Sequence, residues 1–368
     1  MPPVIINWPI GSHHGWGIRG LGYALNWEGG LYSSMPEGVA AELPPDDPRW
    51  PVLRRRLEAS AQLQGALAKA VPEWEASDAA VLVPLGNDLI ARPVAYGRMV
   101  RGRPTIACPV FEDVEMVKAN IERLKPYDAV VVASRWNQEV LGGLGVDARL
   151  VHEGIDPIIF NPSVRKPRND GRFRVFSGGK PEYRKGQDLV IEAFKLFAET
   201  HDDAVLVAAW GSPFSQSGLD FEGKWEYGAP PGSHIGRPNF HAWLQRAGLK
   251  PHQYEIVEPR ANWRMAEVYG SCDVALFPNR CEGGTNFVAM ECMACGVPTA
   301  ISIAFGMDDL LGTGEFSQIR GSEADCVELC VDAMNEASEG SAFAASVWGS
   351  YWTWERHCRE MAEIIAGA

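Results

Sequence analysis

One stretch of the sequence, FSGGKPEYRKGQDLVIEAF (176–194), combines a pair of glycines with three cations and a third glycine. Its pattern predicts a strand that ends at the glycines, a short turn that carries the cations, and an amphipathic helix. Glycine lets a ligand approach the backbone closely, and lysine and arginine form strong hydrogen bonds to phosphate oxygens. The stretch therefore suits a bound diphosphate; the alternative is a basic turn that only precedes a helix. The residues concerned are Gly178, Gly179, Lys180, Arg184 and Lys185.

A second stretch, EGGTNFVAMECMACGVP (282–298), follows the predicted strand 273–278. It predicts a short loop and then a helix, whose first N–H groups favour an anion. Glu282 lies at the strand end, where its carboxylate can accept hydrogen bonds from two sugar hydroxyls; the alternative is a charge that favours the helix dipole. Glu291 lies inside the helix between apolar neighbours, which argues against a plain exposed position. The loop residues are Gly283, Gly284, Thr285 and Asn286.

Alternating strands and helices carry these two stretches. Short apolar runs predict buried parallel strands at 4–8, 79–83, 104–108, 129–133, 174–178, 204–210, 254–259, 273–278 and 298–302. Helical stretches separate them at 53–71, 114–124, 137–144, 187–199, 262–269 and 288–295. The run 155–172 holds three prolines and loses periodicity, so it predicts a linker. The segment 211–241 has no clear period and is either a functional insertion or a region where the pattern fails.

This order predicts an α/β fold with two doubly wound Rossmann-like domains. Ligands of such sheets bind beyond the carboxyl ends of the strands. We therefore expect the site in the cleft between the two domains.

Taken together, the two stretches resemble the retaining glycosyltransferases with the GT-B fold, glycosyl transferases group 1, typified by sucrose, mannosyl and glycogen synthase-like enzymes. In that family the first stretch usually reads G-R and then K-G, and the second reads E-G-F-G, a second glutamate and A-M-A-x-G-x-P. Two further segments are similar to the family, RLVHEGIDPIIFNP (149–162) and CPVFEDVEM (108–116) followed by DAVVVASRWNQEVL (128–141). The resemblance covers nearly the whole chain from Gly11 onward.

The resemblance implies roles for the residues of both stretches. Lys180 and Lys185, beside Arg184 and the two glycines, would hold the donor diphosphate. Glu291 would bind the ribose hydroxyls, and Arg260 would lie near the base. Glu282 and the backbone of 283–286 would hold the transferred sugar. The loop 11–20, with Ser12, His13, His14 and Gly15, would lie over the phosphates or the acceptor, and Glu112 is expected in the same region.

The resemblance also implies the division of the chain. Residues 1–163 would form an acceptor-binding domain and residues 164–345 a nucleotide-sugar-binding domain. Residues 346–368 would form a helix that crosses back to the N-terminal domain; the alternative is a terminal helix that packs on its own domain.

Three departures from the family pattern stand out. Eight residues separate Glu282 from Glu291, where the family has seven, and the two glycines after Glu282 could absorb the extra residue as a bulge. Lys180 replaces an arginine, which keeps the charge and gives up bidentate geometry. Many relatives carry a histidine near the end of the fourth N-terminal strand, where this chain reads Ala107-Cys108-Pro109. His13, His14 and Glu112 are the candidates to fill that space.

Composition excludes several other classes of protein. The formal net charge of −13 argues against general binding to nucleic acid or anionic lipid, so we interpret the arginines at 54–56 as a solvated helix face. No apolar run approaches the ~20 residues that cross a bilayer, and the first residues lack the pattern of a signal peptide. The expected location is the cytoplasm.

Cysteines and tryptophans could be chemical groups or core residues. Cys292 and Cys295 form a C-x-x-C, but they fall in a predicted helix among Met and Ala, which favours buried core residues over redox or zinc chemistry. Cys326 and Cys330 receive the same interpretation. The tryptophans of the N-terminal half would suit a sugar-stacking surface, although burial is the commoner explanation; they are Trp8, Trp16 and Trp27.

The function predicted from the sequence is retaining transfer of a hexose from a nucleotide diphosphate sugar, of the UDP-glucose or GDP-mannose type, to a hydroxyl acceptor. The acceptor (a saccharide, a lipid-linked group or a small molecule) is not identified. Because no D-x-D occurs, we expect no metal and no cofactor. The alternatives are an epimerase or phosphorylase on the same fold, or a catalytically silent nucleotide-sugar-binding protein. A dinucleotide dehydrogenase is weaker, because no G-x-G-x-x-G follows the first strand in proper form.

Overall fold

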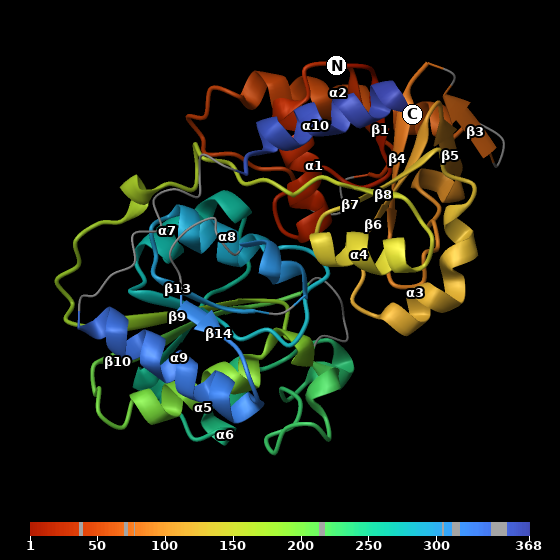
Figure 1. Cartoon of the computed structure of the whole chain (residues 1–368). Helices are drawn as coiled ribbons and strands as arrows, with labels where there is room; N and C mark the ends of the chain where they lie inside the picture. Colours follow the sequence, from red (N-terminus) through yellow and green to blue (C-terminus); the bar gives the residue numbers. More distant parts are fainter. Residues whose placement is uncertain are drawn as a thin grey trace.

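The computed structural model describes residues 1–36, 40–69, 73–76, 78–212, 218–303, 305–310, 317–339 and 352–368. Two six-stranded parallel sheets lie one above the other (Figure 1). The strand order is β2-β1-β4-β6-β7-β8 in the first sheet and β11-β10-β9-β12-β13-β14 in the second. In both, helices connect most of the neighbouring strands, as is usual for parallel pairing. The predicted α/β fold with two doubly wound sheets is confirmed.

The first sheet contains β1 (Val4–Ile6), β2 (Leu31–Ser33), β4 (Ala80–Leu85), β6 (Thr105–Pro109), β7 (Ala129–Val132) and β8 (Ala148–Leu150). The second contains β9 (Phe173–Gly179), β10 (Ala204–Trp210), β11 (Tyr254–Ile256), β12 (Val274–Phe277), β13 (Thr299–Ser302) and β14 (Ser317–Ile319). A separate two-stranded pair joins β3 (Glu73–Ala76) and β5 (Met99–Gly102). The inner strands are buried along their length, because helices cover both faces of each sheet.

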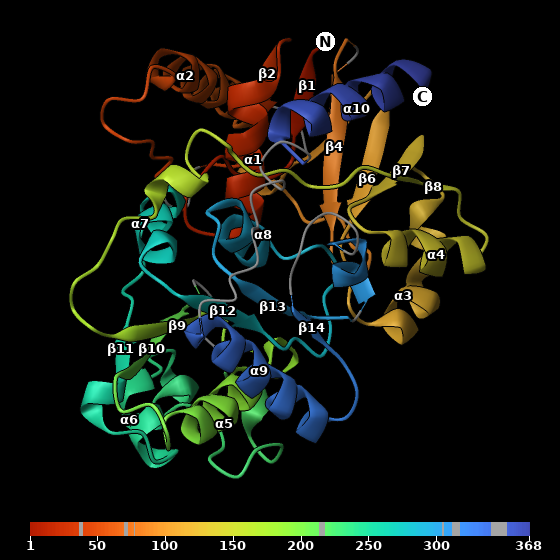
Figure 2. The same ribbon diagram turned by 60° about the vertical axis from the view of Figure 1, so that its left-hand side comes forward.

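The helices are α1 (Gly15–Asn26), α2 (Trp50–Leu67), α3 (Val114–Asn120), α4 (Arg135–Gly143), α5 (Gln187–Phe197), α6 (Phe240–Arg246), α7 (Met265–Gly270), α8 (Phe287–Ala294), α9 (Glu323–Ser338) and α10 (Trp354–Gly367). On the second sheet, α5, α6 and α9 share one core with the strands, and α7 and α8 share the other. Figure 2 shows α8 between the two sheets, below α1.

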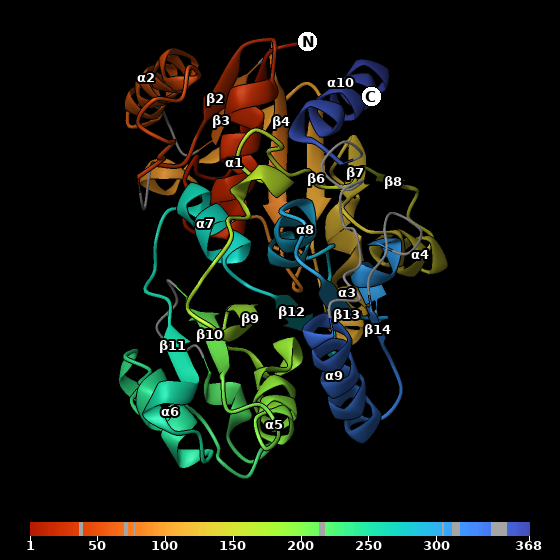
Figure 3. The same ribbon diagram turned by 90° about the vertical axis from the view of Figure 1, so that its left-hand side faces the viewer.

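The last helix, α10, follows the second sheet in the chain but packs on the first (Figure 3). Cys358, Met361 and Ile365 lie in the same apolar core as β1 and α1. His357 bonds the hydroxyl of Tyr23 through Nε2 at 2.9 Å. The domain boundary expected at residue 345 lies outside the described residues.

Candidate active site

The strand order reverses between β1 and β4 in the first sheet and between β9 and β12 in the second. Such reversals leave a crevice at the carboxyl ends of the strands, where ligands bind. Both stretches singled out in the sequence lie at the second reversal, since one follows β9 and the other follows β12. The two sheets also meet at these ends, where the Asn262 N–H donates to the carbonyl of Ser12 at 2.7 Å.

Close packing explains two glycines, one at the end of β9 and one before α5. A Cβ on Gly178 would lie 2.6 Å from the ring of Phe176, and one on Gly186 would lie 2.2 Å from the carbonyl oxygen of Pro278. Gly186 also has a φ of 71°, a left-handed conformation that glycine adopts without strain. It ends the 3₁₀ turn Tyr183–Lys185 and begins α5, so the turn and its cations are held against the loop after β12.

Glu282 and the cations of this turn form one buried cluster. The residue Glu282 is 4% exposed, and its carboxylate pairs with Lys185 and, at 2.9 Å, with Arg184. Asn279 and Asn286 also donate to this carboxylate. Burial alone would raise the pKa of Glu282, but the two ion pairs outweigh it and hold the pKa below its ordinary value. The cluster therefore keeps an anion and two cations together at the crevice.

The cluster extends to the N-terminal sheet through Arg184. Its guanidinium lies 3.3 Å from Glu112 and 2.8 Å from Glu182. Lys180 pairs with the same Glu182 at 2.9 Å. The three cations and Glu112 are thus gathered in one place.

The extra residue between the two glutamates lies where the sheets meet. The hydroxyl of Ser134 donates to the carbonyl of Gly283 at 2.6 Å. A Cβ on Gly283 would lie 2.4 Å from the carbonyl oxygen of Phe111, so glycine is required there. The stretch Gly283-Gly284 is therefore pressed against the N-terminal sheet, and the next residues turn back toward α8.

Asn286 begins α8 in a left-handed conformation, with a φ of 65°. Its side chain accepts from the Ala289 N–H at 3.4 Å while its amide donates to Glu282 at 3.2 Å. The neighbouring Thr285 is buried, and its hydroxyl lies 3.1 Å from the sulfur of Met290. Asn286 thus fixes Glu282 relative to the first turn of α8.

Glu291 lies in a separate network with neutral partners. It is 2% exposed and accepts hydrogen bonds from the amide of Asn262 and the hydroxyl of Tyr269, both at 2.8 Å. Burial raises its pKa to about 7, and the two neutral donors only partly oppose this. The expectation that Glu291 is not a plain surface residue is confirmed. Its carboxylate changes charge near neutral pH.

The loop 11–20 is shorter than expected, because α1 begins at Gly15 and only residues 11–14 precede it. His14 caps this helix, its Nδ1 accepting from the Gly17 N–H at 3.1 Å. Ser12 is buried and exchanges two hydrogen bonds with the backbone of Glu42. Gly15 reaches the C-terminal half, since a Cβ there would lie 3.8 Å from the ring of Phe287. His13 lies between Ser12 and the cap and is half-buried.

Arg260 is exposed and lies apart from the Glu282 cluster, its Nε donating to the carbonyl of Glu258 at 3.2 Å. The neighbouring Pro259 contacts Gly211 at the end of β10. Arg260 therefore lies on the side of β9 where β10 and β11 are, whereas the loop after β12 that contacts the cations lies on the other side.

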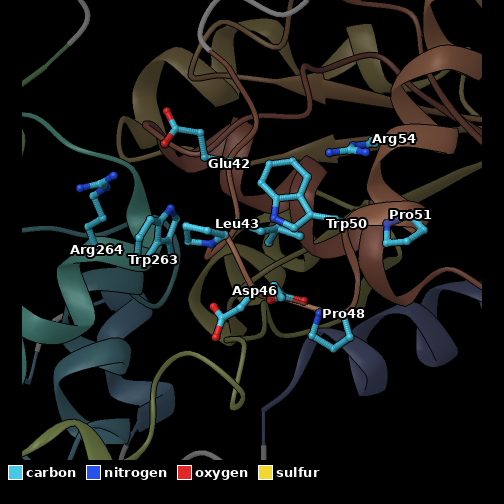
Figure 4. Close-up of a pocket in the computed structure, with 11 residues that line it drawn as sticks. Glu42, Leu43, Asp46, Pro48, Trp50, Pro51, Arg54, Trp263 and Arg264 are labelled. Atoms are coloured by element: carbon cyan, nitrogen blue, oxygen red, sulfur yellow. The ribbon is translucent and has the colours of Figure 1, made fainter.

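A surface pocket of about 610 Å³ lies between the two halves of the chain but outside the Glu282 cluster. Figure 4 shows Trp50 and Arg54 on one side of it and Trp263 and Arg264 on the other. Beside it, Arg49 bonds Asp156 of the predicted linker at 2.7 Å. The pocket therefore borders the connection between the sheets.

Most of the cysteines and tryptophans considered as chemical groups in the sequence lie in the hydrophobic core. Cys292 and Cys295 are buried in the core beneath α8, and all eight cysteines are free. Trp8 and Trp27 are buried, so the prediction that they are core residues is confirmed. Arg54 and Arg55 are exposed on α2. No cluster of potential metal ligands occurs among the residues that the structure describes.

Three residues near the site were not predicted from the sequence. Glu153 and Arg19 approach each other beneath the cleft at 3.7 Å. Arg280 bonds Asp188 at the start of α5 twice, at 2.7 and 2.9 Å, and holds the cationic turn in place. A charged residue directly after a predicted strand was the only available signal, and it applies to Arg280 alone.

Two facing Rossmann-like sheets, with a cationic turn and a helix N-terminus at the reversal of the second, define the class of GT-B glycosyltransferases. Residues 162–340 match the family described as Glycosyl transferases group 1. The matched part of the chain contains both stretches singled out in the sequence.

Solved structures with this fold match the whole chain. The sucrose-phosphate synthase of Thermosynechococcus elongatus has a TM-score of 0.62 at 15% identity, covering 100% of this chain and 99% of that chain. HepE of Anabaena, in complex with UDP and glucose, has a TM-score of 0.63 at 13% identity, covering 100% of both chains. The E. coli trehalose-6-phosphate structure, bound with UDP-2-fluoro glucose, has a TM-score of 0.57 at 14% identity, covering 99% and 95%. At these identities the matches establish the fold alone.

No curated protein sequence matches this chain significantly. Within the described residues, no helix combines the length and the apolar character needed to span a membrane.

Proposed function

We propose that this protein is a retaining hexosyltransferase that moves a hexose from a nucleotide diphosphate sugar, of the UDP-glucose or GDP-mannose type, to a hydroxyl acceptor. The observation that carries the proposal is the cluster of Lys185, Arg184 and Glu282 at the strand reversal of a glycosyl transferases group 1 domain. The binding of UDP or a UDP-sugar by proteins of the same fold supports the choice of donor.

Lys180, Arg184 and Lys185 would hold the diphosphate. A lysine has three N–H donors and an arginine five, so these side chains can bond Glu282 and phosphate oxygens together. The N-terminus of α8 adds a favourable dipole for the same anion. These groups would stabilise the charge that develops on the leaving diphosphate.

The two glutamates would divide the rest of the donor between them. Glu291 would accept hydrogen bonds from the ribose hydroxyls in exchange for its bonds to Asn262 and Tyr269. Glu282 and the backbone of 283–286 would hold the transferred hexose. The acceptor hydroxyl would then attack the anomeric carbon from the face that the diphosphate leaves, which retains the configuration. Eight free cysteines support placing this reaction in the cytoplasm.

Ligand binding tests the proposal first. In a thermal-shift series with UDP, GDP and ADP, one nucleotide should stabilise the protein, by about 2.7 kcal/mol at a hundred times its Kd. Lys185→Ala should weaken binding of that diphosphate about ten- to a hundredfold and binding of the nucleoside far less. Equal losses for both ligands would contradict the phosphate role.

Turnover then separates the transferase from its alternatives. UDP-glucose and GDP-mannose should release nucleotide diphosphate, and NMR of the transferred sugar should show a retained anomeric configuration. Conversion of the donor without transfer would indicate an epimerase, and tight binding with no release would indicate a silent binding protein.

We propose that the reaction needs no metal ion. Three cations can neutralise the diphosphate, and the sequence contains no D-x-D. Turnover should persist in excess EDTA. Loss of turnover that magnesium or manganese restores would contradict this part of the proposal.

A further inference from the structure

Glu153 brings a second carboxylate from the N-terminal sheet to the loop that contains Glu282. It follows β8, and the residue is 8% exposed. A Cβ built on Gly284 would lie 3.3 Å from Oε2 of Glu153. The carboxylate therefore lies against the segment proposed to hold the transferred hexose, on the side of the N-terminal sheet.

Arg19 of α1 is the cation nearest to this carboxylate. It is 2% exposed and lies 5.1 Å and 5.2 Å from the ring centres of Trp8 and Trp16. Its closest approach to Glu153 is 3.7 Å, which is too long for a hydrogen bond. Its Nε is buried and has no hydrogen-bond partner among the described residues. Arg19 thus gives Glu153 a countercharge without occupying its oxygens.

Across the described part of the chain, no side chain or backbone group donates a hydrogen bond to the oxygens of Glu153, although buried carboxylates ordinarily have such donors. By contrast, Glu112 is paired with Arg184, and His14 caps α1. A buried carboxylate without hydrogen bonds, beside a proposed reaction centre, marks a functional position.

We propose that Glu153 binds the acceptor hydroxyl and takes up its proton during transfer. This inference rests on the proposed function. The acceptor oxygen forms a bond to the anomeric carbon while the bond from that carbon to the β-phosphate oxygen breaks. The electron pair of the broken bond leaves with the diphosphate, and the hydroxyl proton moves to the carboxylate of Glu153. Glu153 later returns the proton to solvent.

The charged and titratable groups around Glu153 are consistent with this role. They are Arg19 from α1, Cys108 from β6, His152 beside it and Glu282 across the cleft. Burial raises the pKa of Glu153 and Glu282 adds to this, while Arg19 and His152 oppose it; the pKa lies above its ordinary value. A raised pKa brings a carboxylate closer to the range in which general bases work efficiently.

The test compares the full-length wild type with Glu153→Gln, which keeps the size of the side chain. UDP-glucose and GDP-mannose serve as donors with water as the acceptor, and release of UDP or GDP is measured. The expected result is a fall in kcat of about a hundredfold or more, since general bases contribute at least this much, while KM for the donor changes less than about threefold. The acid limb of the pH profile should disappear in this variant. The control is Glu192→Gln on α5, a half-buried residue that is paired with Lys195 and lies outside the site, and it should match the wild type.

A double variant, Arg19→Met with Glu153→Gln, separates catalysis from a purely structural ion pair. Removing both charges should restore thermal stability that Glu153→Gln loses, and kcat should stay low. Recovery of kcat in the double variant, or wild-type kcat in Glu153→Gln, would overturn the proposal. Absence of nucleotide release and of nucleotide binding in the wild type would instead overturn the proposed function itself.

Discussion

Glu282 and Glu291 lie nine positions apart in one loop and helix, and both are buried, yet their surroundings differ. Glu282 is held by two cations, Lys185 and Arg184. Glu291 accepts only from Asn262 and Tyr269, which are neutral. The pKa of Glu282 is lowered, whereas burial raises the pKa of Glu291 to about 7.

The difference shows that the partners of a buried carboxylate, and not burial itself, set its charge. Glu282 remains an anion and fixes the cations that would receive a diphosphate. Glu291 can exist in either form near neutral pH, and a ribose whose hydroxyls donate to it would favour the ionised form. The proposed division of the donor between sugar and ribose therefore predicts different responses to mutation and to pH.

The largest expected effect is on stability, from Lys185→Met. This change leaves Glu282 buried with one cation fewer, and breaking a buried ion pair costs about 3–5 kcal/mol. Urea denaturation at pH 7 would measure the free energy of unfolding. The double variant Lys185→Met with Glu282→Gln should recover most of the loss, because no buried carboxylate then lacks its partner.

The matched control is Lys125→Met, whose ion pair with Glu122 is exposed on both sides. It should change the free energy of unfolding by less than about 0.5 kcal/mol. If Lys185→Met were as harmless as this control, Arg184 and the two asparagines would suffice for Glu282, and the contrast between the glutamates would weaken.

The second prediction concerns pH. Because the folded pKa of Glu291, about 7, exceeds the ordinary value of 4.5, its contribution to stability is fully present below pH 4.5 and is lost as pH rises through 7. The free energy of unfolding of the wild type relative to Glu291→Gln should fall by about 3 kcal/mol over that range. Urea denaturation of both proteins between pH 5 and 8 measures the upper part of this change. A constant difference would mean that Glu291 does not titrate there.

Many strands and loops near the two glutamates could be predicted from the sequence, because apolar runs and glycines mark them locally. The turn after β9 and the loop after β12 are examples. The edge strands β2, β8 and β14 have three residues each and were not predicted, since such short runs show no periodicity. The pattern of α1 does not predict a helix start at Gly15, because four glycines interrupt it.

Long-range contacts explain the rest of what the sequence does not reveal. Gly283 needs to be glycine because Phe111 approaches it, and Glu153 becomes notable only beside Arg19 and Gly284. These residues are distant in the chain and come together where the two sheets meet. The neutral partners of Glu291, Asn262 and Tyr269, likewise come from the segment that contains α7.

A third prediction compares ligand binding and rate. Glu291→Gln should weaken binding of the free nucleotide diphosphate and of the whole donor alike, about tenfold, through loss of charged hydrogen bonds to ribose. Glu282→Gln keeps an oxygen that accepts from Lys185 and Arg184, so binding of the free nucleotide diphosphate should stay unchanged. Transfer should slow about a hundredfold, because misplacement of the reacting sugar costs orientation. Titration calorimetry and initial rates measure the two effects. An unchanged rate in Glu282→Gln would assign the sugar to the backbone of 283–286 alone.

The smallest expected effect comes from Tyr269→Phe, which removes one neutral donor to Glu291 and leaves the ring in the core. A hydrogen bond to a charged acceptor stabilises more than one to a neutral acceptor, so the loss should be about 1 kcal/mol at pH 6 and about 2 kcal/mol at pH 8. Tyr254→Phe is the matched control, since the Tyr254 hydroxyl is bonded to the amide of Gln245 at 2.9 Å and its loss should not depend on pH. Urea denaturation of both variants at the two pH values separates these outcomes. If Tyr269→Phe lost the same free energy of unfolding at both pH values, Glu291 would keep one charge state across this range. Glu291 would then differ from Glu282 only in lacking cationic partners.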